Sequence, residues 1–181
     1  MGGGDKGLLA LGGGTVLGQV VARIEPQVTR LALNANGDPA RFAALGLPVR
    51  PDTIDGQLGP LAGILTAMDW ARDHGAAWVF TVAGDTPFLP GDLIPRLMLA
   101  AEDAPSGMAI ATCDGRAHPT CGLWPVGLAD DLRRTLQDGT RRLTDWTDKH
   151  TAAMAPFPAT KPDPFFNINT PDDLVTAREF L

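Results

Sequence analysis

The chain of 181 residues is 44% hydrophobic and 20% charged, which is ordinary for a soluble globular protein, so we predict a single domain over residues 1–181. Its formal net charge of −6 argues against binding that is driven by nucleic-acid phosphates. No apolar stretch approaches the roughly 20 residues that span a bilayer and no signal peptide is visible, so we expect a cytoplasmic protein without a membrane partner.

The first part of the chain alternates segments with helical and with extended patterns. The expected elements are a helix over 15–24, a strand over 29–34, a short helix over 40–45 and a brief strand over 48–50. Thr15 is the expected N-cap of the first helix, and Pro26 ends it.

The middle of the chain predicts a helix, a strand and a second helix. The first helix is expected to begin at Gly59 and Pro60, because proline fits the first helical turn. Its buried stripe is formed by Leu61, Ile64, Leu65, Met68 and Ala71. A short apolar run over 76–83 then predicts a buried strand, and a helix over about 92–101 follows it.

The last part of the chain predicts a hairpin followed by mostly helical segments. The expected elements are strands over 108–113 and 120–124, helices over 126–137 and from about Arg141, and a strand over 165–169. A final helix should begin at Thr170, because Pro171 and two acidic residues follow this N-cap. The alternation through residue 101 favours right-handed, parallel α/β layers.

Asp85 is the acidic residue that closely follows the predicted strand over 76–83. In open α/β sheets the carboxyl ends of the strands form the rim where ligands bind. A carboxylate there is well placed to hold a divalent metal on a phosphate-rich substrate. The residue could equally form an Asx-turn or cap the helix that follows Asp92. From this segment alone the two interpretations have about equal weight.

Amide and carboxylate side chains follow other predicted strands on the same rim. Asn34 and Asn36 end the strand over 29–34, and Asp52 follows the next strand. Such amides can contact a base or a ribose, although asparagine after a strand is slightly more often a turn former. Asn167 and Asn169 would face one side of a strand, which suits binding better than packing.

Basic residues near the two ends of the chain are candidates for binding phosphate. The glycine-rich stretch before Lys6 lets backbone amides approach an anion, but it matches neither a P-loop nor a dinucleotide fingerprint. A flexible glycine-rich terminus is the simpler interpretation. The Arg141-Arg142 pair could bind a phosphate or only begin a helix. Cys113 and Cys121 form no metal-binding pattern, so we expect reduced thiols.

Seven short motifs in chain order resemble those of the molybdenum cofactor guanylyltransferase (MobA) family. They are Asp5-Lys-Gly-Leu-Leu9, Asn34-Ala-Asn36, Gly59-Pro-Leu-Ala-Gly63, Gly84-Asp-Thr-Pro87, His118-Pro-Thr120, Gly139-Thr-Arg-Arg142 and Phe166-Asn-Ile-Asn-Thr-Pro171. The resemblance implies a three-layer, Rossmann-like nucleotidyltransferase fold with a mostly parallel central sheet. It also implies an enzyme that transfers GMP from GTP to molybdopterin and releases pyrophosphate.

The resemblance also assigns roles to the candidate residues. It implies that Lys6 contacts the GTP phosphates, that Asn34 and Asp52 bind the nucleoside, and that Asp85 binds both the nucleotide and Mg²⁺. Lys6 and Asp85 are then the catalytic residues. Further substrate contacts are implied for Gly59, Pro60, Arg141, Asn167 and Asn169, the last three on the pterin side. We expect a monomer that makes at most transient contact with other molybdenum-cofactor proteins.

One part of the family pattern has no counterpart in this sequence. Members of the family begin with a strand and a Leu-Ala-Gly-Gly-x-x-x-Arg-Met-Gly loop, and Met1-Gly2 aligns with the end of that loop. We expect that about 15–20 residues are missing, with a start codon assigned too late as the simplest explanation. Without a central strand, two sheet edges should be unpaired.

Two alternative functions stay open at this stage. The first is a CTP-dependent or sugar-phosphate nucleotidyltransferase of the same fold. The second is an inactive remnant that binds GTP or a pterin but lacks the phosphate-binding loop.

Overall fold

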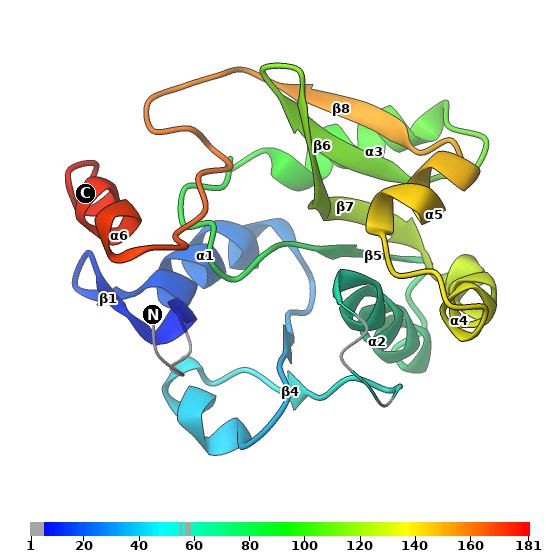
Figure 1. Cartoon of the computed structure of the whole chain (residues 1–181), viewed down its shortest axis with the longest axis horizontal. Helices are drawn as coiled ribbons and strands as arrows, with labels where there is room; N and C mark the ends of the chain where they lie inside the picture. The colour runs from blue at the N-terminus through cyan, green and yellow to red at the C-terminus, as the bar shows by residue number, and fades with distance from the viewer. Residues whose placement is uncertain (1–5, 55, 57–58) are drawn as a thin grey trace.

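A computed structural model describes residues 6–54, 56 and 59–181 (Figure 1). Its α-helices are α1 (Val16–Ile24), α2 (Pro60–Asp73), α3 (Leu93–Glu102), α4 (Ala129–Gln137), α5 (Leu143–Lys149) and α6 (Pro171–Arg178). Its strands are β1 (Ala10–Leu11), β2 (Gly14–Thr15), β3 (Leu33–Asn34), β4 (Val49–Arg50), β5 (Trp78–Thr81), β6 (Ala109–Cys113), β7 (Arg116–Pro125) and β8 (Ala153–Phe157). Short 3₁₀ helices are η1 (Lys6–Leu8), η2 (Glu25–Gln27), η3 (Pro39–Leu45) and η4 (Val126–Leu128).

The largest sheet has four strands in the order β5-β7-β6-β8. β7 runs antiparallel to both of its neighbours, whereas β6 and β8 are parallel. The expected hairpin is confirmed, because β6 and β7 are joined by a tight turn at Asp114 and Gly115. The sheet is therefore mixed, since a hairpin return places one antiparallel strand among strands that share a direction.

Two helical layers cover this sheet, which confirms the expected three-layer α/β arrangement (Figure 1). Leucines of α1 and α3 pack with Ala109 and Ala111 on one face of β6. The other face carries Ile110, which packs with residues of α2, α4 and α5. Each fully buried leucine contributes about 1.5–3 kcal/mol relative to an exposed one, so these two clusters hold the layers together.

The helices α1 and α6 begin where the local sequence predicts. The Thr15 hydroxyl accepts a hydrogen bond from the Gly18 amide at 3.0 Å and caps α1. At α6, the Thr170 hydroxyl accepts from the Asp173 amide, and the Asp173 carboxylate accepts from the Thr170 amide. The predicted stripe of α2 is confirmed as buried, and it consists of Leu61, Ile64, Leu65, Met68 and Ala71.

Two predicted strands differ in the structure, and three strands, β1, β2 and β8, were missed. Only Leu33 and Asn34 of the segment 29–34 are in a strand. The segment 165–169 is not a strand, because an Asp163 turn and a bond from the Ile168 amide to the Asp85 carbonyl carry it across the loop after β5. The longest of the missed strands, β8, contains Pro156, which hides the pattern and is tolerated because β8 lies at a sheet edge. β1 and β2 have two residues each, too few for a period of two to be visible in the sequence.

A large cavity separates the four-stranded sheet from the parallel pair β3-β4. Its volume is about 1080 Å³, and residues 28–35, 76–85 and one side of α2 line it. Among the described residues, β3 pairs with β4 alone and β5 with β7 alone, so both strands lack a partner on their other side. No helix in the described part of the chain is long and apolar enough to cross a membrane.

The apolar walls of this cavity should bind the fluorescent dye 1-anilinonaphthalene-8-sulfonate in the native state. Ala67 lines the cavity from α2, whereas Leu99 is an exposed residue of α3 outside it. We expect Ala67→Glu to remove most of the dye fluorescence and Leu99→Glu to leave it unchanged, with both folds checked by circular dichroism. Equal dye fluorescence in all three proteins would contradict this view of the cavity.

Candidate functional site

Asp85 lies in the loop after β5, where it lines the cavity. Its Oδ1 atom is buried and has no hydrogen-bond partner among the described residues. Burial raises the pKa of the Asp85 carboxyl above its ordinary value, although nearby Lys6 opposes this shift. The alternative role as a cap of α3 is not observed, since the residue at that N-cap is Asp92.

Four further polar side chains gather around Asp85. The buried Thr86 hydroxyl donates to Asn167 Oδ1 at 2.9 Å. Lys6 Nζ donates to Asn169 Oδ1 at 3.2 Å. The structure thus brings both predicted asparagines to the Asp85 loop, although not as neighbours on one strand face. Thr86 is the contact that sequence reasoning missed, and its position directly after Asp85 was the available signal.

A second polar group lies at the ends of β3 and β4. Asn34 Nδ2 donates to Asp52 Oδ1 and to the Arg50 carbonyl, each at 3.0 Å. Asn36 Nδ2 donates to Asp52 Oδ2 at 2.8 Å, and Asn36 Oδ1 accepts from the Asp52 amide at 2.8 Å. The predicted pair Asn34 and Asp52 is therefore one hydrogen-bonded unit at the expected rim.

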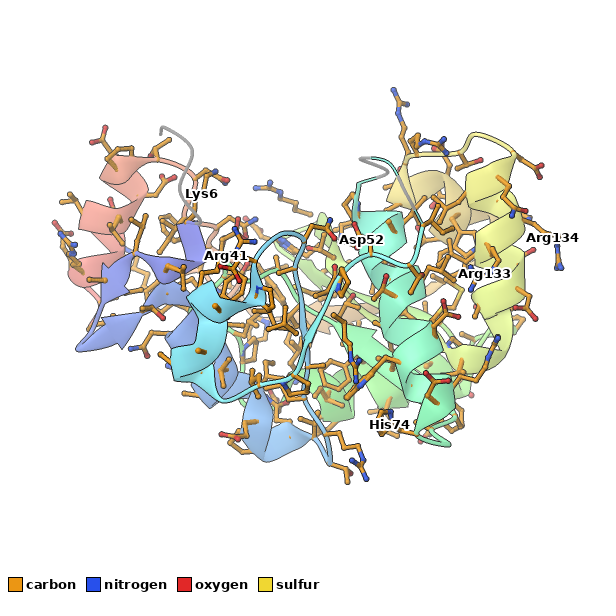
Figure 2. All side chains as sticks on the ribbon, turned by 90° about the horizontal axis from the view of Figure 1, so that it is seen from below. Lys6, Arg41, Asp52, His74, Arg133 and Arg134 are labelled. Atoms are coloured by element: carbon orange, nitrogen blue, oxygen red, sulfur yellow. The ribbon has the colours of Figure 1, made fainter. Side chains whose placement is uncertain are left out.

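The two polar groups face the same cavity. Lys6, Asn34, Asp52 and Asp85 all line it, and Figure 2 shows Lys6 and Asp52 toward the same side of the molecule. Gly63, in the first turns of α2, lies so close to Asn34 Oδ1 that a β-carbon there would be only 2.6 Å away. The beginning of α2 therefore lies directly beside the β3 group.

The remaining predicted residues divide between the cavity and its surroundings. Gly59 and Pro60 line the cavity at the start of α2. Arg141 does not line it, because its guanidinium donates to the Leu136 and Thr140 carbonyls at the end of α4. Residues 2–5 of the glycine-rich segment lie outside the described residues.

The donor set around Asp85 fits a magnesium ion shared with phosphates. No group of three or more His, Cys, Asp or Glu that could hold a metal is present in the described ranges. Mg²⁺ is often held by one or two carboxylates together with substrate phosphates and water, rather than by a protein cage. The unpartnered, buried oxygen of Asp85 is a ligand of that kind.

Two other predicted features have structural roles. His118 stacks on Phe165 with ring centroids 4.3 Å apart, and burial lowers its pKa below the ordinary value. Cys113 and Cys121 are free and buried, as expected for reduced thiols. Burial raises the pKa of Cys121 to about 11, which keeps this thiol protonated.

The sequence of this chain is similar to those of known proteins. A family model described as a MobA-like NTP transferase domain matches residues 1–153. A molybdenum cofactor guanylyltransferase from Mesorhizobium japonicum is 51% identical over 186 residues, a match that covers 100% of this chain and 89% of the relative.

Solved structures have the same fold. Molybdopterin-guanine dinucleotide biosynthesis protein A from Archaeoglobus fulgidus superposes with a TM-score of 0.71 at 23% identity, covering 98% of this chain and 91% of that one. A 2-C-methyl-D-erythritol 4-phosphate cytidylyltransferase from Thermus thermophilus has a TM-score of 0.68 at 18% identity, covering 97% and 93%. At these identities the likeness is one of fold alone.

The desolvated Asp85 carboxylate should cost stability at neutral pH. Folding raises the pKa of Asp85, so the protonated carboxyl stabilises the folded protein. This stabilisation is fully present below the pKa in the unfolded chain, about 3.9, and is lost as the pH rises through the pKa in the folded protein. We expect Asp85→Asn to have a higher urea midpoint than the wild type at pH 7.5, and no such gain near pH 3.5. The exposed Asp130→Asn serves as control. An equal midpoint at pH 7.5 would contradict the burial cost.

Proposed function

The chain belongs to the family of MobA-like nucleotidyltransferases, and we propose that it transfers GMP from GTP to molybdopterin and releases pyrophosphate. The observation that carries this proposal is the convergence of Lys6, Asn34, Asp52 and Asp85 on one cavity at the strand ends. The relative at 51% identity bears the name of this activity, which favours GTP over the CTP and sugar-phosphate alternatives.

The proposed reaction is an in-line displacement at phosphorus. The terminal phosphate of molybdopterin attacks the α-phosphorus of GTP, one P–O bond forms, and the bond to the departing pyrophosphate breaks. The attacking phosphate is already anionic near neutral pH, so no side chain has to remove a proton. The polar residues around the cavity suit positioning and charge neutralisation rather than general base catalysis.

Lys6 and Asp85 supply the charges that this reaction needs. Asp85 would hold Mg²⁺, which neutralises phosphate oxygens when it is bound. Lys6, whose charge acts on Asp85, would stabilise the pyrophosphate leaving group. Its bond to Asn169 Oδ1 orients the ammonium group before substrate binds.

The other residues of the cavity are assigned to substrate binding. Asn34 and Asp52 would bind the nucleoside, while Gly59 and Pro60 border the same space. Asn167 and Asn169 are kept as candidates for the molybdopterin side, because they lie beside the Asp85 loop and are exposed. We do not extend this role to Arg141, since its guanidinium is bound to carbonyl oxygens of α4.

The proposal also covers the partners, the oligomeric state, the compartment and the cofactor of the enzyme. GTP and molybdopterin are the proposed partners, with transient contacts to other molybdenum-cofactor proteins. We propose that the enzyme acts as a monomer in the cytoplasm, with Mg²⁺ as the cofactor.

Asp85→Ala tests the central role in this proposal. We expect Mg²⁺-dependent pyrophosphate release from GTP and molybdopterin to fall by roughly 100-fold or more, because the metal ligand is lost. The measurement is a coupled pyrophosphate assay, with circular dichroism to show that the variant is folded. Asp130→Ala, an exposed carboxylate paired with Arg72, should keep normal activity. Wild-type release from Asp85→Ala would disprove the assignment.

A nucleotide comparison separates the proposed activity from its two rivals. With molybdopterin present, we expect pyrophosphate release with GTP to exceed release with CTP by about 100-fold or more, as is reached when a site pairs with polar groups of one base only. A preference for CTP would favour the cytidylyltransferase alternative. GTP binding without release from either nucleotide would identify the inactive remnant.

A further inference from the structure

Asn36 lies in the turn that follows β3 and has no part in the proposed function described above. Its side chain makes two bonds to one residue, Asp52. The amide nitrogen donates to the Asp52 carboxylate, and the amide oxygen accepts from the Asp52 backbone N–H, each at 2.8 Å. One planar amide therefore holds both the main chain and the side chain of Asp52.

These bonds continue the pairing of β3 and β4 beyond the point where the strands end. The last backbone bond between the two segments joins the Ala35 amide to the Arg50 carbonyl at 3.0 Å. One step further along, Asn36 meets Asp52 through its side chain instead of its main chain. Because the β3-β4 ladder is only two residue pairs long, this side-chain contact extends a short connection between the two segments.

The carboxylate of Asp52 is oriented from both sides. Oδ1 accepts from Asn34 at 3.0 Å and Oδ2 accepts from Asn36 at 2.8 Å, so neither oxygen can turn without breaking a bond. The peptide beyond Asp52 is tied separately to α2, where the Thr53 amide donates to the Thr66 hydroxyl at 3.0 Å. Asn36 is thus the residue that joins the Asp52 backbone and carboxylate to the β3 side of the cavity.

We propose that Asn36 is a positioning residue for nucleotide binding, which acts by holding Asp52 in its binding orientation. The proposal rests on the proposed function, in which Asp52 contacts the nucleoside. When a binding group is already held in its bound orientation, less conformational entropy is lost on binding. The loss of Asn36 should therefore weaken GTP binding more than it slows the chemical step.

Asn36→Ala removes both bonds to Asp52. We expect the dissociation constant for GTP with Mg²⁺, measured by isothermal titration calorimetry, to rise about tenfold, as is typical when a charged group loses a hydrogen bond. KM for GTP should rise with it, while kcat stays within about twofold. Without any ligand, the Asp52 amide should exchange hydrogen about tenfold faster in NMR measurements, because its acceptor is gone.

Asn36→Asp is the matched isostere, because it keeps the acceptor for the Asp52 amide but replaces the donor by a second carboxylate. Two adjacent carboxylates raise the pKa of one of them, and a shared proton restores the lost bond as the pH falls. Besides Asp52, the charged side chain of Arg41 contacts Asn36, since its guanidinium donates to the Asn36 carbonyl oxygen. Relative to the wild type at each pH, GTP binding by Asn36→Asp should be weak at pH 8 and recover toward pH 5, whereas Asn36→Ala should not recover.

Asp38→Ala controls for general loosening of the turn. Asp38 caps η3 by accepting from the Ala40 amide, and no hydrogen bond joins it to Asp52 in the described part of the chain. We expect it to bind GTP within about twofold of the wild type. The proposal is overturned if Asn36→Ala binds GTP normally, if Asp38→Ala weakens binding equally, or if Asn36→Asp shows no recovery at low pH.

Hydrogen exchange of the Asp52 amide, measured without ligand, distinguishes a failure of this proposal from a failure of the proposed function on which it rests. If the wild type does not bind GTP, the proposed function fails, whatever the state of Asn36. If it binds GTP and the Asp52 amide exchanges equally fast in the wild type and in Asn36→Ala, then Asn36 does not hold Asp52 and the positioning role alone is overturned.

Discussion

A carboxylate that is buried on folding loses hydrogen bonds to water, and other charges or donors must replace them. The rest of the site is arranged around this requirement at Asp85. Its buried Oδ1 has no partner among the described residues, and burial raises its pKa. The surrounding structure holds the loop in place, because the Ile168 amide donates to the Asp85 carbonyl and Thr86 donates to Asn167. Lys6 supplies a positive charge nearby, but no direct bond satisfies the oxygen. A carboxylate that is held in place and has an oxygen without a partner among the described residues is suited to bind a divalent ion that arrives with a nucleotide.

The two halves of the site stand on two separate sheets. Asn34 and Asp52 are carried by the β3-β4 pair, whereas Asp85 follows β5 of the four-stranded sheet. α2 connects them, because it packs against β5 and its first turns contact Asn34. The cavity between the halves is large and mostly apolar in its walls, so the distance between Asp52 and Asp85 depends on this helix more than on any direct pairing.

Local signals were most reliable where a single side chain decides the structure. Thr15 and Thr170 cap α1 and α6 as their sequences predict, since a hydroxyl next to unpaired amides satisfies them without tertiary help. Strands were less predictable. The segment 29–34 has a strand pattern, yet only two of its residues pair, because a ladder needs a partner that the local sequence does not encode. β8 was missed, since Pro156 interrupts its pattern and only its edge position tolerates that residue.

By itself the sequence determined the residue types of the site and their order after the strands, because periodicity places polar residues such as Asn34, Asp52 and Asp85 at one rim. Only the tertiary structure decided which of them touch. It joined Asn36 to Asp52, brought Asn169 to Lys6, and turned Arg141 toward the end of α4. It also left Asp85 Oδ1 buried with no hydrogen-bond partner in the described ranges of the chain. The physical reason is that a hydrogen bond depends on angles and distances set by packing between segments far apart in the chain, which no local pattern specifies.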